Sequence, residues 1–66
     1  MKILINGETK DLPEGVTLSQ MIERLSLPPR RMAIELNKRV IRRQDWETTK
    51  LEERDAIEIV HFVGGG

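Results

Sequence analysis

The sequence predicts an α+β fold in which a mixed sheet of about five strands carries one main helix on one face. Two segments with strand-turn-strand patterns, residues 2–12 and 32–41, flank a single amphipathic helix pattern. An apolar segment over residues 57–63 follows and predicts a last strand. Connections this short favour adjacent placement, so residues 1–63 are expected to fold as one domain that is followed by a flexible glycine tail, residues 64–66.

The first hairpin is indicated by alternation and by its turn. Ile3 and Ile5 fall on one side of the opening strand. Asn6 and Gly7 follow, and both residue types tolerate the positive φ that a two-residue hairpin turn requires. The return strand is therefore expected over residues 8–12.

The helix has a clear start and a clear stop. Thr17 is suited to the N-cap and Gln20 stands three residues later, as in a capping box. Pro28 and Pro29 are expected to end the helix, because a proline disfavours helical geometry in the residue before it. Helical spacing places one apolar face toward the sheet, formed by Leu18, Met21, Ile22 and Leu25.

The second half repeats the strand pattern. Residues 32–37 read as a strand, residues 37–39 as a turn, and Val40 as the start of a short return strand. Residues 43–47 could form one helical turn that docks Trp46. The last strand is apolar on both faces, which is typical of a central strand. One face carries Ile57, Ile59, His61 and Val63, and the other carries Glu58, Val60 and Phe62. In the ubiquitin-like β-grasp arrangement this strand lies beside the first, and its C-terminal end projects from the sheet.

Three glycines, Gly64, Gly65 and Gly66, close the chain and predict a tail that can thread a narrow channel, because glycine has no side chain. A free α-carboxylate on Gly66 is ionised at neutral pH and is a poor electrophile until it is acylated or adenylated. One hypothesis is that Gly66 is the reacting group. The alternative is an ordinary frayed chain end.

Composition excludes several function classes. The chain has no cysteine, which removes disulfides and thiolate catalysis, and we expect no metal site and no autonomous enzyme. Eleven basic residues balance eleven acidic ones, so no strong field would attract nucleic acid. No stretch approaches the roughly 20 apolar residues of a membrane span. A cytoplasmic protein without membrane or nucleic-acid partners is expected.

Several short motifs follow one another along the whole chain. They are Met1-Lys2-Ile3-Leu4-Ile5-Asn6-Gly7, Gly15-Val16-Thr17-Leu18, Ala33-Ile34-Glu35-Leu36-Asn37, Val40-Ile41-Arg42-Arg43-Gln44-Asp45-Trp46, Glu53-Arg54-Asp55-Ala56-Ile57-Glu58-Ile59 and the terminal glycines. No single one of these motifs is specific, but their order within 66 residues is. Through this order the full chain resembles the small sulfur-carrier proteins of thiamine biosynthesis, which are ubiquitin-like. The family pattern has two terminal glycines, and this chain has a third.

The resemblance implies a carrier that binds no cofactor itself and is acted on by partner enzymes. An E1-like adenylyltransferase would use ATP to adenylate the carboxylate of Gly66, with Gly65 and Gly64 as its tether. A sulfur donor such as a cysteine desulfurase would convert the adenylate to a thiocarboxylate, which would give its sulfur to thiazole synthase.

Partner contacts are expected on the sheet face opposite the helix, where nothing in this chain covers Leu4, Val60 and Phe62; exposed apolar patches of this kind mark interfaces. Two alternative functions stay open at this point. One is the small sulfur-carrier subunit of molybdopterin synthase, and the other is a noncatalytic β-grasp binding module.

Overall fold

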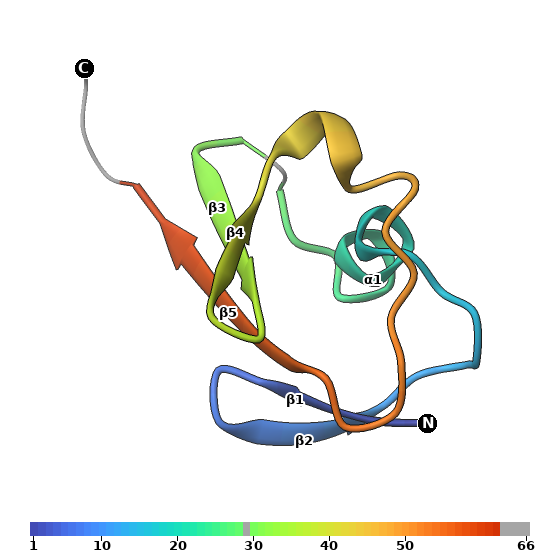
Figure 1. The fold of residues 1–66 in the computed structure, drawn as a ribbon. Coiled ribbons are helices and arrows are strands. Elements are labelled where there is room, and N and C mark those ends of the chain that lie inside the picture. The colour runs from blue at the N-terminus through green and yellow to red at the C-terminus, as the bar shows by residue number, and fades with distance from the viewer. Residues whose placement is uncertain (29, 63–66) are drawn as a thin grey trace.

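One helix packs on one face of a five-stranded sheet in the computed structural model, which describes residues 1–28 and 30–62 (Figure 1). The elements in chain order are β1 (Lys2–Ile5), β2 (Glu8–Asp11), α1 (Leu18–Arg24), β3 (Met32–Leu36), β4 (Arg39–Ile41), the 3-10 turn η1 (Arg43–Asp45) and β5 (Ala56–His61). The predicted fold class is confirmed. The expected boundary between domain and tail falls at Val63 and the three glycines, which lie outside the described residues.

The last strand lies at the centre of the sheet, as predicted. The strand order is β2-β1-β5-β3-β4. β5 runs parallel to β1, with Leu4 opposite Ala56 and Ile5 opposite Ile57. On its other side β5 runs antiparallel to β3, from Leu36 opposite Ile57 to Met32 opposite His61. The sheet is therefore mixed, and its parallel pair joins the first strand to the last.

The core lies between α1 and the facing side of the sheet. Trp46 is buried there, and its indole Nε1 donates a hydrogen bond of 2.9 Å to the carbonyl oxygen of Ile41. The predicted docking of Trp46 after a short helical turn is thus confirmed. The buried side chains of the core are Ile3, Ile5, Leu12, Val16, Leu18, Met21, Ile22, Met32, Ile34, Trp46, Leu51, Ile57 and Ile59.

The start of α1 has the predicted capping box. The backbone N–H of Gln20 donates to the hydroxyl of Thr17 at 3.2 Å, and the backbone N–H of Thr17 donates to the side-chain oxygen of Gln20 at 2.9 Å. Two N–H groups that the helix itself leaves without partners are therefore satisfied.

The end of α1 differs from the prediction. The helix ends at Arg24, with Leu25 as C-cap, before Pro28 is reached. Ser26 adopts a φ of +56° and its N–H donates to the Glu23 carbonyl at 3.0 Å, while the Leu27 N–H donates to the Ile22 carbonyl at 3.2 Å. These two bonds form a Schellman motif, in which a left-handed residue closes the last turn. The motif stops the helix, and the proline follows it.

The second hairpin turn is also shorter than predicted. Asn37 and Lys38 have φ values of +51° and +70°, so these two residues make the turn alone. Arg39 already pairs with Leu36 as the first residue of β4. The sequence did not show this, because a lysine gives no strong signal for the left-handed region.

Ser26→Gly is expected to raise the free energy of unfolding by about 0.5–1 kcal/mol, because glycine adopts the left-handed conformation without a steric cost. Thermal unfolding followed by circular dichroism measures the change. Ser19→Gly is the matched control within α1, where glycine is expected to destabilise by about 0.5 kcal/mol. A lower melting temperature for Ser26→Gly would contradict this assignment of the helix end.

Candidate functional site

The C-terminal end of β5 is the part of the sheet nearest the terminal glycines along the chain. β1 pairs with β5 only as far as Ile57, whereas β3 follows β5 to His61. One further bond extends this side, from the Phe62 N–H to the carbonyl oxygen of Arg31 at 2.7 Å. The end of β5 therefore projects past β1 and is held by neighbouring backbone on one side. Gly64, Gly65 and Gly66 lie outside the described residues.

Asn6 contacts the edge of β5 that faces β1, just beyond the point where β1 ends at Ile5. Its backbone N–H donates to the Ile57 carbonyl at 2.9 Å. Its side-chain Oδ1 accepts a hydrogen bond of 2.7 Å from the Ile59 N–H, and its Nδ2 donates to the Ile59 carbonyl at 3.4 Å. One residue of the β1–β2 turn thus binds backbone groups of both Ile57 and Ile59 in β5. The sequence analysis identified Asn6 only as a turn residue.

Asn37 makes equivalent contacts at the other end of β5. Its side-chain Oδ1 accepts from the Ala56 N–H at 2.9 Å, and its Nδ2 donates to the Asp55 carboxylate at 3.0 Å. Its backbone N–H donates to the Ala56 carbonyl at 2.7 Å. Turn asparagines commonly bind backbone groups through their amides, but which strand they reach is set by the tertiary fold.

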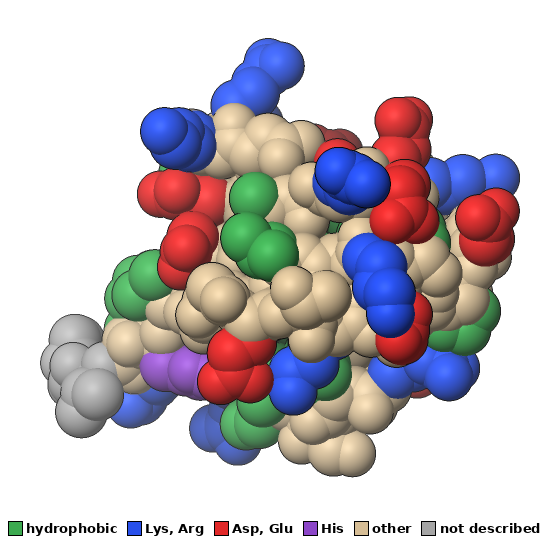
Figure 2. Space-filling model, turned by 90° about the horizontal axis from the view of Figure 1, so that it is seen from below, with side chains coloured by type: hydrophobic (Ala, Val, Ile, Leu, Met, Phe, Trp, Pro, Cys, Tyr) green, Lys and Arg blue, Asp and Glu red, His purple; other side chains and the backbone are tan. Residues whose placement is uncertain are grey.

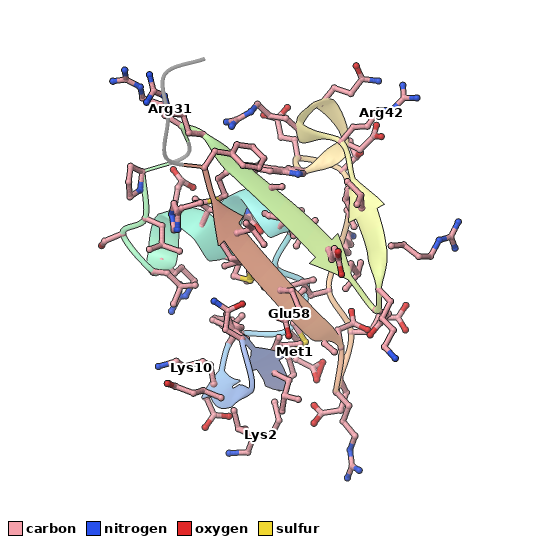
Figure 3. The ribbon with its side chains drawn as sticks, turned by 90° about the vertical axis from the view of Figure 1, so that its left-hand side faces the viewer. Met1, Lys2, Lys10, Arg31, Arg42 and Glu58 are labelled. Carbon is pink, nitrogen blue, oxygen red and sulfur yellow. The ribbon has the colours of Figure 1, made fainter. Side chains whose placement is uncertain are left out.

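The sheet face opposite α1 carries exposed apolar side chains (Figure 3). Leu4 is 43% exposed, Val60 is 50% exposed and Phe62 is 56% exposed. These are the three residues that the sequence placed there. Val40 on the edge strand β4 is 69% exposed and was not singled out, although it pairs with Glu35 on the same face. We call this surface the open face.

Two acidic residues lie opposite each other in the middle of the open face. Glu58 of β5, labelled in Figure 3, is paired in the sheet register with Glu35 of β3. Like charges that face each other across a sheet lower stability. Glu58 also precedes Val60 on the same side of β5, so the open face carries two acidic side chains beside its apolar ones. The alternation pattern placed Glu58 on this face, but its neighbour across the sheet depends on the strand order.

The shorter of the two ion pairs among the described residues lies at the β1–β2 end of the sheet, away from the C-terminal end of β5. Lys2 Nζ lies 2.8 Å from the Asp11 carboxylate at the β1–β2 hairpin. The hydrogen bond and the charge of Asp11 raise the pKa of Lys2, and the same contact lowers the pKa of Asp11. The stabilisation from Asp11 is present at neutral pH and is lost as the pH falls through its lowered pKa. Because both side chains are exposed, this contribution is small.

Four further features concern the described residues. Seen from the side of the β1–β2 hairpin, acidic and basic side chains are interspersed (Figure 2). Among residues 1–28 and 30–62, no group of three His, Cys, Asp or Glu side chains could hold a metal ion. Within the same part of the chain, no helix is long and apolar enough to cross a membrane. A depression at the start of α1 is lined by residues 13–16, Gln20, Glu23 and Arg24, and by none of β5.

A β-grasp domain whose central last strand leads to terminal glycines defines the class of ubiquitin-like carrier proteins. The chain belongs to the ThiS family, whose model matches residues 3–66. Members of this family from Bacillus subtilis and Escherichia coli carry the name sulfur carrier protein. The resemblance noted from the sequence is confirmed, and the thiamine pathway is favoured over the molybdopterin alternative.

Individual relatives agree with this assignment. The sulfur carrier protein ThiS of Bacillus subtilis is 38% identical over 63 residues, which cover 94% of this chain and 96% of that protein. A thiazole synthase of Magnetococcus marinus is 42% identical over all 66 residues, but the chain spans only 20% of its length. The same share applies to a thiazole synthase of Paramagnetospirillum magneticum at 30% identity. The crystal structure of the thiamine biosynthesis protein ThiS from Geobacter metallireducens superposes with a TM-score of 0.88 at 26% identity, covering all of both chains.

Glu58→Gln is expected to raise the free energy of unfolding by about 0.2–1 kcal/mol, because it removes the like charge opposite Glu35. Thermal unfolding at low and at high salt measures the gain, which should shrink as salt screens the surface charges. Glu47→Gln, an exposed acid outside the sheet, is the control and should change little. Equal gains in both variants, or a gain that does not depend on salt, would contradict the repulsion.

Proposed function

We propose that the carboxylate of Gly66 is the group that carries sulfur, with Gly65 and Gly64 as its tether. An E1-like adenylyltransferase would transfer AMP from ATP to this carboxylate and release pyrophosphate. The terminal sulfur of a persulfide, formed on a donor such as a cysteine desulfurase, would attack the carbonyl carbon and expel AMP. A thiol would then reduce the resulting acyl disulfide and release the thiocarboxylate. Adenylation is needed because a bare carboxylate lacks a leaving group.

The observation that carries this proposal is the extent of the family match, which runs through residue 66 and so includes all three glycines. The position of β5 supports it, because the strand that leads to the tail is anchored at the centre of the sheet. A tail that follows such a strand starts from a fixed point. The cytoplasm, expected from the sequence, is the proposed site of this cycle.

Thiazole synthase is the proposed acceptor of the sulfur. In two relatives, the segment similar to this chain is one fifth of a longer protein named thiazole synthase. A carrier and its acceptor that are joined in one chain act at high effective concentration. Those relatives therefore support a direct encounter between this carrier and thiazole synthase.

The open face is the proposed surface for partner binding. Leu4, Val60 and Phe62 supply the apolar contact, since exposed apolar side chains that gather on one face commonly mark an interface. Phe62 also lies closest in sequence to the tail, so a partner that binds it would receive the glycines next. A binding module without tail chemistry would use the same face, and the experiments below separate the two functions.

Incubation with an E1-like adenylyltransferase, ATP and a persulfide donor is expected to add the mass difference between sulfur and oxygen at Gly66. Intact-mass spectrometry with C-terminal fragmentation locates the change. Deletion of Gly66 should abolish ATP-dependent pyrophosphate release and leave thermal stability unchanged, because the tail adds little to packing. Pyrophosphate release retained by the deletion variant would place the reaction on Gly65 or on no glycine. No mass change with an active adenylyltransferase would favour the binding module.

Phe62→Asp is expected to weaken binding to the adenylyltransferase by about tenfold or more, because it places a charge in the apolar interface. Its melting temperature should change little, since Phe62 is already 56% exposed. Titration calorimetry and thermal unfolding measure the two effects. Val40→Asp on the edge strand of the same face is the control and should weaken binding less. A large loss of stability with unchanged binding would instead make Phe62 a packing residue.

A further inference from the structure

The side chain of Asn6 takes the place of a missing piece of β1. Residues 57 and 59 of β5 direct their backbone groups toward the β1 side, and β1 ends at Ile5. The Asn6 backbone binds the Ile57 carbonyl, and its amide then binds both the N–H and the carbonyl of Ile59. A side-chain amide has the same donor and acceptor as a peptide group. Asn6 therefore extends the β1 side of the sheet by the equivalent of one peptide.

This contact is the last one on that side of β5. Among residues 1–28 and 30–62, no hydrogen bond reaches β5 from the β1 side beyond Ile59. On the other side, β3 and Arg31 continue to His61 and Phe62. Without the amide of Asn6, β5 would be held from one side only after Ile57. A strand held on one edge can swing about that edge more freely than one held on both.

The turn itself does not require this amide. Asn6 has a φ of +50° and Gly7 a φ of +83°, and glycine would satisfy both positions. The two bonds to Ile59 are thus a separate property of the asparagine. Asn37 at the second turn has nearly the same φ, +51°, and binds the beginning of β5 in a similar way. The two asparagines contact the same strand from opposite edges, Asn37 at Ala56 and Asn6 at Ile57 and Ile59.

We propose that Asn6 is a positioning residue for the activation of the tail, a role that rests on the proposed function above. By holding Ile59 it fixes the direction in which β5 leaves the sheet. Six residues lie between Ile59 and Gly66, so the direction of β5 at Ile59 sets where the tail begins. A tethered reactant that is presented in fewer orientations reaches the productive geometry more often.

Asn6→Gly tests the proposal and Asn37→Gly is the matched control. Both substitutions keep a residue that accepts a positive φ, and both remove side-chain bonds to β5. The control also removes the bond to Asp55, so it is at least as severe a change for the fold. Steady-state pyrophosphate release with the E1-like adenylyltransferase gives kcat and KM for the full chain, and thermal unfolding reports the stability of each variant.

Asn6→Gly is expected to lower kcat about tenfold with little change in KM, because the open face still binds while the carboxylate is presented poorly. Asn37→Gly should keep kcat within about twofold of the unchanged chain. Equal losses of kcat in the two variants, or a loss in KM alone, would overturn the proposal. An unchanged chain that releases no pyrophosphate would instead overturn the proposed function.

A second measurement needs no partner enzyme. Hydrogen exchange at the Ile59 amide measures how well its hydrogen bond to Asn6 protects it. Nitrogen-15 relaxation at His61 and Phe62 measures the motion of the backbone that follows. Faster exchange and larger motion in Asn6→Gly, and not in Asn37→Gly, would support the anchoring. The same values in both variants would overturn it even if the kinetics differ.

Discussion

The insertion of the last strand between the first and third is the constraint on which the other elements depend. β1 with β2 and β3 with β4 are two separate hairpins, and only β5 joins them into one sheet. Ile57 and Ile59 also place its inner face in the core under α1. A strand with both roles cannot move without loss of the whole domain. In the first part of β5, Ile57 is paired with a strand on both of its edges.

The helix α1 covers only one face of the sheet, so the open face remains accessible to a partner. The buried side contains only apolar side chains, and no charged residue is buried among those described. The open face instead carries Val60 and Phe62 beside the facing carboxylates of Glu35 and Glu58. Like charges placed opposite each other across a sheet cost stability, and proteins commonly accept such a cost where a surface serves a function.

Local signals predicted most of the fold, and contacts distant in sequence account for what was missed. The start of α1 was read correctly because a capping box lies within four residues. The end of α1 was not, since Ser26 is an unusual residue for a left-handed C-terminal cap. The contacts of Asn6 with Ile59 join residues 53 positions apart, and no local pattern reveals such a pair. Exposure of the open face followed from simple alternation, but the identity of its binding partner did not.

The pairing of β1 with β5 also governs how the domain assembles. Each hairpin and α1 can form from neighbouring residues, whereas the parallel pair closes a loop from Leu4 to Ala56 before any of its bonds form. Loops of this size slow the search for the native state, because their entropy is lost before the contacts are gained. Acquisition of the native sheet therefore waits for the strand nearest the terminal glycines. A chain that has not folded presents no anchored strand, so a partner that recognises this strand would bind only molecules whose folding is complete.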